Sequence, residues 1–275
     1  MADPLSPSPS PAAPPRRPRT GHEHRRHLVR RAAGHHLFEG MRRPWLTYGL
    51  LAVMALSHLA LGLVMVVEGQ TDLLGALVVV RPEALLVRAG GQAAAAIDQG
   101  EVWRLVSCVF LHNDGLHLFM NGLALFGLGR LCESLYGRPR FLFLFLMAGL
   151  AGSTLSYLGG HRLSVGASGA VFGLMGAPIV FGWRHRDELP EGLGDQLRRA
   201  LLPWVGLNLL VGLMLPFIDN LAHLGGLLTG GALALLLGNR VVPGRQGASW
   251  ATGLMVAFSL ALLGGAAAGV ASGWL

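Results

Sequence analysis

Long apolar segments, separated by short polar stretches, occupy most of the chain after its first 43 residues. Seven of these segments approach the roughly 20 residues that a helix needs to cross a lipid bilayer. The pattern therefore predicts an all-α protein that crosses a membrane several times. The predicted spans are Tyr48–Val67, Leu116–Leu135, Phe141–Leu158, Ser168–Trp183, Leu201–Phe217, Asn220–Leu237 and Trp250–Val270.

Polar segments flank the first span on both sides. Residues 1–43 are rich in Pro, Ser, Arg and His and lack apolar periodicity, which predicts a disordered basic arm. The loop from Glu68 to Gly115 contains amphipathic pieces such as Leu73–Val80, and we expect it to lie in the membrane interface. The chain thus divides into the arm (1–43), a six-span core with a long first loop (44–238), and a linker with a seventh span (239–275).

Composition identifies lipid as the solvent for most of the chain. Hydrophobic residues make up 52% and charged residues 13%, and the mean hydropathy is +0.50. The 40 glycines agree, because helices in lipid associate through small residues rather than by excluding water. Cys108 and Cys132 lie inside or beside apolar runs, so we expect two unpaired core thiols rather than a disulfide framework or metal cluster.

Arginine supplies all 22 basic residues, and the net charge is +7. In a membrane protein this excess indicates topology before nucleic-acid binding. With the N-terminus inside, 18 arginines fall on inner segments, and the outer segments hold only Arg81, Arg88, Arg104 and Arg162. We therefore expect a cytoplasmic N-terminus, an outside C-terminus and a bacterial inner membrane. A solvated basic tail near anionic lipid is a simpler interpretation than metal binding for His22, His24, His27, His35 and His36.

The outer ends of three predicted spans carry polar residues at one depth: His112, His117 and Asn121 on the second, Ser168 on the fourth and His223 on the sixth. Polar groups inside a membrane are costly and usually functional. The fourth span is short, because its 16 residues extend only about 24 Å against an apolar core of about 30 Å. We therefore expect Ser168 below the membrane surface, reached by a glycine-containing stretch.

Serine becomes a good nucleophile when a base removes its proton, and histidine titrates near neutral pH. Small residues follow both side chains, and such faces let helix backbones approach closely enough to bring Ser168 to His223. From spacing alone, a packing seam with an incidental serine and histidine is an equally good interpretation. The small residues are Gly169, Gly173 and Ala177 on one span and Gly226 and Gly230 on the other.

Asn121 and His117 form an i, i+4 pair on one helical face. Their side chains could donate hydrogen bonds to an oxyanion that develops during a reaction. A polar clamp between two helices is the alternative, and the spacing alone slightly favours the clamp.

Several motifs, in order along the chain, resemble those of the rhomboid intramembrane proteases. The GxSG signature is matched by GASGAVFG at Gly166–Gly173, and AHxxGxxxG is matched by AHLGGLLTG at Ala222–Gly230. The WR motif of the first loop is matched by Trp103 and Arg104. The GxxxExxxG pattern is matched around Glu133 in GLGRLCESLYG. The resemblance implies a rhomboid-like six-helix core, to which the predicted seventh span adds one C-terminal transmembrane helix.

This resemblance also implies a catalytic dyad without an acid, in which Ser168 attacks the scissile carbonyl and His223 is its base. The Ser168 backbone N–H, the Asn121 amide and the His117 ring would hold the oxyanion. Phe172 stands where the family usually has an aromatic residue that stacks on the catalytic histidine, although it lacks the hydroxyl of tyrosine.

Other residues are implied in support rather than in chemistry. Arg104 would organise the first loop, with a plain interfacial arginine as the alternative, and His112 would brace the same loop. Glu133 would take part in a network that ties helices together. The supporting set is completed by Gly166, Gly226, Gly230 and Trp103.

Two features depart from the family's pattern. Asp219 lies four residues before His223, where the family usually has no acid. We expect an exposed helix-start residue, because aspartate is favoured at helix N-termini. The other departure is the seventh span, which makes a six-plus-one form.

We therefore expect an intramembrane serine endopeptidase that cuts membrane proteins and needs no cofactor or metal. Its partners would be transmembrane substrates and the lipid bilayer, not nucleic acid. A catalytically silent rhomboid-like binding or chaperone protein is the alternative, but such a relative is expected to lose Ser168 or His223. A transporter would continue its polar residues toward the inner face, whereas the fourth and sixth spans are apolar there.

Overall fold

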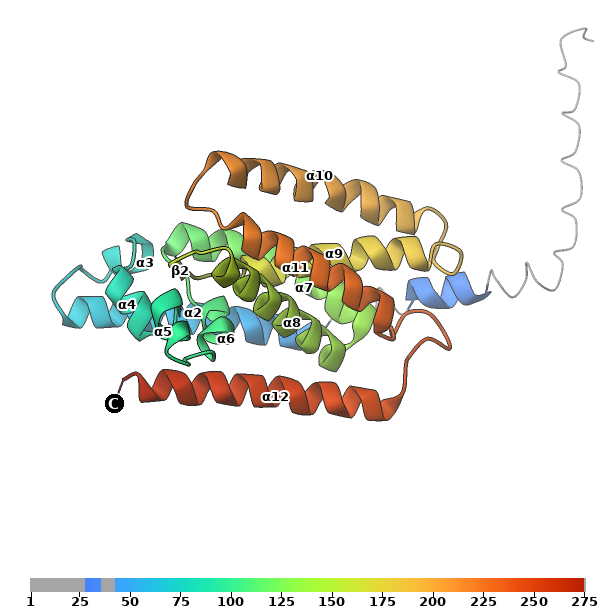
Figure 1. Ribbon diagram of the computed structural model, residues 1–275. Helices are drawn as coiled ribbons and strands as arrows, with labels where there is room; N and C mark the ends of the chain where they lie inside the picture. The colour runs from blue at the N-terminus through green and yellow to red at the C-terminus, as the bar shows by residue number, and fades with distance from the viewer. Residues whose placement is uncertain (1–27, 36–42, 275) are drawn as a thin grey trace, which may run out of the picture.

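The computed structural model describes residues 28–35 and 43–274 and consists mostly of helices (Figure 1). Five described helices are long and apolar enough to cross a membrane: α2 (Trp45–Val67), α7 (Gly115–Tyr136), α8 (Arg138–Leu158), α10 (Leu193–Met214) and α12 (Ser249–Ser272). Two shorter helices, α9 (Ser168–Arg184) and α11 (Asn220–Leu236), lie among them. These elements confirm the predicted all-α, multi-pass membrane fold.

The helix ends lie close to the predicted ones, with the largest difference at the fifth span. There α10 begins at Leu193, where the polar first turns extend the helix beyond the apolar run. It ends at Met214 because Leu215, which precedes a proline, adopts an extended conformation. Residues 28–35 form a helix within the arm that was expected to be disordered. The rest of the arm to residue 42, with His22, His24, His27 and His36, lies outside the described residues.

The first loop folds into several short elements. They are α3 (Gly75–Val78), α4 (Glu83–Arg88), β1 (Gln92–Ala93), α5 (Ala94–Asp98), α6 (Arg104–Ser107) and the 3₁₀ turn η1 (Cys108–Phe110). Strand β1 pairs antiparallel with β2 (Leu163–Ser164), with Gln92 opposite Ser164. This small sheet, which the sequence did not predict, joins the first loop to the segment between α8 and α9.

Helices α9 and α11 meet through their backbones. A Cβ atom at Gly226 would lie 1.8 Å from the carbonyl oxygen of Gly169, and one at Gly230 would lie 2.1 Å from that of Gly173. No larger residue fits at these positions without moving a backbone, so glycine permits the close approach. The expected core thiols are also confirmed, because Cys108 and Cys132 are free and buried.

Two other contacts hold the outer helices to this centre. Buried Glu133 on α7 accepts hydrogen bonds from the backbone N–H and the hydroxyl of Thr47 on α2, both at 2.8 Å. Helix α12 runs beside α6 and α8 (Figure 1). A Cβ atom at Gly269 of α12 would lie 2.2 Å from the Trp103 ring, so this glycine leaves room for the tryptophan.

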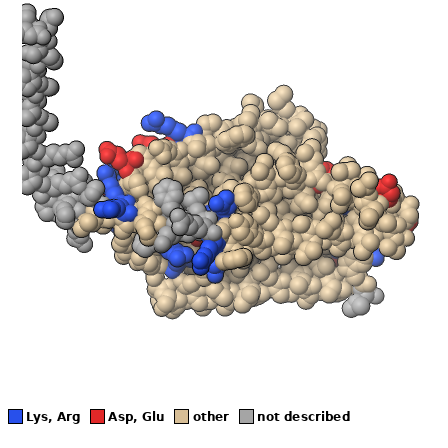
Figure 2. All heavy atoms as spheres, turned by 180° about the vertical axis from the view of Figure 1, so that it is seen from behind, with Lys and Arg blue, Asp and Glu red and all other residues tan. Residues whose placement is uncertain are grey.

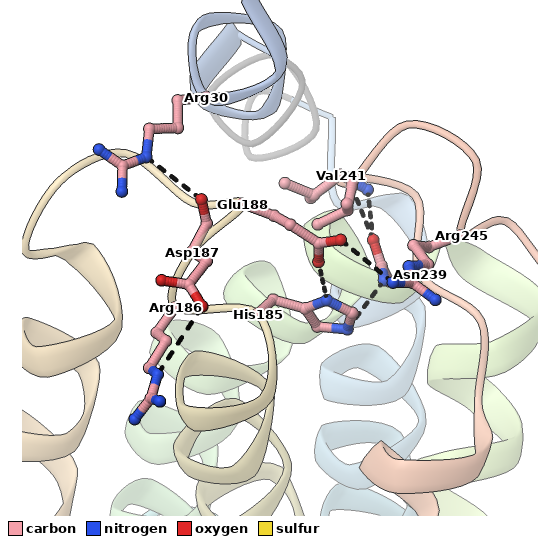
Figure 3. A network of polar contacts seen from close by, with 9 residues as sticks. Arg30, His185, Arg186, Asp187, Glu188, Asn239, Val241 and Arg245 are labelled. Atoms are coloured by element: carbon pink, nitrogen blue, oxygen red, sulfur yellow. Dashed lines mark hydrogen bonds and ion pairs between the residues drawn. The ribbon is translucent and has the colours of Figure 1, made fainter. Parts of the chain in front are cut away.

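One end of the molecule is fastened by a polar network (Figure 3). His185, after α9, pairs with Glu188 at 2.6 Å, and Arg245 reaches the same carboxylate at 3.2 Å. Asn239 lies 3.3 Å from the other ring nitrogen of His185, and Arg30 of the 28–35 helix donates to the carbonyl of Asp187. Burial acts to raise the pKa of Glu188, but the hydrogen bonds from His185 and Arg245 outweigh it and lower this pKa. Arginines gather at this end in Figure 2.

Candidate active site

Ser168 is the first residue of α9. The chain reaches it from β2 through Gly166, whose φ of +126° is a conformation that side-chain-bearing residues rarely adopt. The Gly166 N–H donates to the carbonyl of Cys108 at 3.0 Å, which fixes this segment against η1. Ser168 is partly buried, and its backbone N–H lies in the first helical turn, where such groups have no partner within the helix.

His223 lies one turn into α11, beside the start of α9. A Cβ atom at Gly169 would lie 3.2 Å from the carbonyl oxygen of Ala222, so the residues after Ser168 and before His223 are in contact. The His223 ring is 7% exposed and stacks on Phe172, with ring centroids 4.2 Å apart and planes 10° from parallel. Within the described chain, no hydrogen bond joins Ser168 to His223, and Nδ1 of His223 has no hydrogen-bond partner.

His117 and Asn121 approach the same segment from α7. A Cβ atom at Gly166 would lie 2.7 Å from Nε2 of His117 and 3.9 Å from Nδ2 of Asn121. The His117 backbone N–H is held by Asp114, which caps α7 at 2.8 Å. Nδ2 of Asn121 donates to the His117 carbonyl at 3.0 Å, so this bond lies within α7 rather than between helices. The structure therefore brings both side chains within reach of the residues just before Ser168.

Residues of the first loop lie next to His117 and to the segment before Ser168. His112 is fully buried, and its ring lies edge-on to that of His117 at 5.1 Å. Buried Arg104 donates to Glu101 at 2.7 Å and to the Gly91 carbonyl at 3.2 Å, which ties α6 to the turn before β1. The Arg104 guanidinium also lies 4.6 Å from the centre of the Trp103 ring.

The remaining predicted residues lie at contacts between helices. Glu133 is in the last turn of α7 and binds α2, while Gly226 and Gly230 line the contact between α9 and α11.

Asp219 differs from its predicted environment. It starts α11 as expected, and its carboxylate accepts a hydrogen bond from the Ala222 N–H at 2.9 Å. The prediction that it is exposed is wrong, because its side chain is only 14% exposed. The reason is that Ser156 and Ser164 donate hydrogen bonds to the same carboxylate. Sequence reasoning missed both serines, because they lie more than 50 residues before Asp219 and carry no motif.

The family model described as "Rhomboid domain" matches residues 99–240, which is just over half of the chain. The chain belongs to the rhomboid family. The matched segment of this rhomboid protein begins in the first loop, contains the whole candidate site and ends before α12.

Similar proteins come from several kingdoms. RHOMBOID-like protein 5 of Arabidopsis thaliana is 39% identical over 158 residues, which cover 55% of this chain and 49% of that protein. Rhomboid protease GluP of Bacillus subtilis is 37% identical over 153 residues, covering 56% and 29%. Rhomboid-like protease 1 of Toxoplasma gondii is 33% identical over 186 residues, covering 65% and 61%. The rhomboid chain thus spans about half or less of the first two relatives.

Proposed function

We propose that this rhomboid-family protein is an intramembrane serine endopeptidase, which hydrolyses peptide bonds in or near the transmembrane segments of other membrane proteins. One observation carries the proposal: residues from three helices, α7, α9 and α11, converge on the start of α9. They provide the chemical groups that acyl transfer needs, namely a hydroxyl, a base and hydrogen-bond donors. Two of the similar proteins are named as proteases, which agrees with the proposal.

The chemistry would begin when the Ser168 hydroxyl attacks the scissile carbonyl carbon and His223 takes its proton. The negative oxygen of the tetrahedral intermediate would accept hydrogen bonds from the Ser168 N–H and from His117 and Asn121. His223 would then protonate the leaving amine, which departs and leaves an acyl-enzyme. A water molecule, deprotonated by His223, would release the second product and restore Ser168. Stacking on Phe172 would orient the His223 ring for these proton transfers.

Membrane-spanning substrates follow from where the site lies. Ser168 and His223 belong to helices that pack among the apolar spans. A peptide bond that reaches them must come from a segment that enters the bilayer and unwinds locally, because helical hydrogen bonds shield the carbonyl. We therefore expect single-span proteins whose helices unwind readily near the outer face to be cut.

A cleavage assay tests the proposed function. The purified protein in detergent is incubated with a panel of model single-span substrates, and the masses of the products locate the cut. We expect a cut within or close to the apolar segment, with Ser168→Ala as the blank. If wild-type protein cuts none of the panel and a soluble serine-hydrolase reagent does not label Ser168, the chain is a silent rhomboid-like binding protein instead.

Orientation is a separate prediction. The 18-to-four arginine division favours a cytoplasmic N-terminus and an outside C-terminus. The membrane we propose is a bacterial inner membrane. Reporter tags before Met1 and after Leu275 are expected to report opposite sides, with the N-terminal tag in the cytoplasm. Tags on one side would contradict the proposed orientation.

Replacing Asn121 with alanine is expected to lower kcat by about 10²-fold or somewhat less. The amide would reach the oxygen that becomes negative, while the Ser168 N–H and His117 would remain. KM and the melting temperature should change little, because the Asn121 hydrogen bond lies within its own helix.

Asn208→Ala is the matched control, since this amide donates to a carbonyl four residues earlier on α10 in the same way. It is expected to keep full turnover. A destabilised Asn121→Ala protein with full kcat per folded molecule would refute the oxyanion role and support a structural clamp.

A further inference from the structure

Asp219 connects the two segments that carry the proposed nucleophile and base. It lies four residues before His223, and it binds Ser164, which lies four residues before Ser168. We infer that Asp219 is a positioning residue, which holds the approach to Ser168 against the start of the helix that carries His223. This inference rests on the proposed function.

The two oxygens of the Asp219 carboxylate serve different segments. Oδ1 accepts from the Ala222 N–H at 2.9 Å and so caps α11. Oδ2 accepts from the Ser164 hydroxyl at 2.9 Å and from the Ser156 hydroxyl at the end of α8. His161 lies 3.8 Å from Oδ1. One side chain therefore joins α8, β2 and α11.

Because Ser164 is bound to Asp219 and lies close to Ser168 in the chain, it limits the movement of Ser168. It belongs to β2 and pairs with Gln92 of β1, which is fully buried and whose amide lies 3.3 Å from the Ser156 hydroxyl. Only three residues separate Ser164 from Ser168, and Gly166 among them is bound to η1. The segment between Ser164 and Ser168 is therefore too short and too restrained to absorb a displacement of Ser164, so Ser168 would move as well.

The Asp219 carboxylate is bound by groups other than the His223 ring. Its oxygens bind Ala222, Ser156 and Ser164, and no hydrogen bond joins it to the ring in the described chain. The backbone bond from His223 to the Asp219 carbonyl is an ordinary helical one at 3.2 Å. Its effect on the reaction thus passes through the position of the two segments.

Two substitutions separate the capping role of Asp219 from the positioning role. Asp219→Ser keeps a hydroxyl that can cap α11, but it is too short to reach β2 and α8. Asp219→Asn keeps the length, caps through its oxygen and can donate to the serine hydroxyls through its nitrogen. We measure kcat, KM and melting temperature for both variants against wild type.

Asp219→Ser is expected to lower kcat by about 10- to 100-fold, the effect of displacing reacting groups by up to about 1 Å. KM and the melting temperature should stay close to wild type, and Asp219→Asn should recover most of the rate. Ser164→Ala should lower kcat similarly, and adding it to Asp219→Ser should cause no further loss. Ser153→Ala is the control, because it removes a buried hydroxyl of α8 that donates to carbonyl groups and not to Asp219.

Each outcome decides the inference. Unchanged kcat in Asp219→Ser, with wild type active and Ser168→Ala inactive, would overturn the positioning role and leave the proposed function standing. A loss of about 10⁴-fold in Asp219→Asn, the size seen when a triad acid is neutralised, would overturn it in favour of direct action on His223. If wild type neither cuts substrate nor accepts a serine-hydrolase reagent, the proposed function fails and the inference fails with it.

Discussion

Alanine at either Ser168 or His223 is expected to abolish peptide cleavage and to leave the fold intact. Neither residue can support catalysis without the other, because the serine hydroxyl needs a base to remove its proton and the histidine needs a hydroxyl to deprotonate. We expect a loss of about 10⁶-fold for each single variant and no further loss for the double variant, because such groups act as a unit. The rates are measured on purified protein with one model substrate.

The structure explains why folding should survive these changes. Ser168 donates no side-chain hydrogen bond within the described chain, and alanine is well accommodated in a helix. His223→Ala also removes the ring stacked on Phe172, so a small loss of thermal stability is expected for that variant alone. Ser259→Ala, which removes a fully buried hydroxyl on α12, is the control and should keep full turnover. Normal turnover by Ser168→Ala would end the protease hypothesis.

Valine at Gly226 is expected to destabilise the protein severely and to remove its activity. Its Cβ atom would meet the Gly169 carbonyl oxygen at 1.8 Å, and a backbone atom cannot rotate away as a side chain can. Inserting atoms into a packed core typically costs 1–3 kcal/mol, and we expect about 3 kcal/mol or more here. Activity should fall beyond the loss of folded protein, because separating α9 from α11 moves Ser168 away from His223.

The control for this variant is the same substitution at Gly264 on α12. Nothing lies within 4 Å of a Cβ atom built there, so Gly264→Val should fold and cut like wild type. Thermal unfolding and kcat per folded molecule are compared for the two variants. A Gly226→Val protein with wild-type stability would contradict this prediction, because it would show that α9 and α11 can separate without a loss of folding free energy.

Local signals explain how much of the fold could be predicted. The starts of α9 at Ser168 and α11 at Asn220 agree with the predicted spans. A glycine-containing stretch precedes the first start, and Asp219, a residue type favoured at helix N-termini, precedes the second. Strands β1 and β2 could not be predicted, since two residues are too few to show a period. Their existence depends on pairing between segments about 70 residues apart.

The residues of the candidate site also divide into those that the sequence could link and those that it could not. His117 and Asn121 could be linked from their spacing on one helix, and Ser168 and His223 from ordered motifs. The environment of Asp219 could not, because its burial comes from Ser156 and Ser164 on other elements. Helix-start propensity correctly identified its backbone role but carried no information about what surrounds its side chain.

The contact between Trp103 and Gly269 has a consequence for biosynthesis. Ribosomes extend chains by about 5–20 residues per second, so the roughly 170 residues between these positions take on the order of 10–30 s to make. During that interval the first loop exists without the helix against which its tryptophan packs. The loop therefore reaches its final fit only after α12 has entered the membrane, as one of the latest events in maturation.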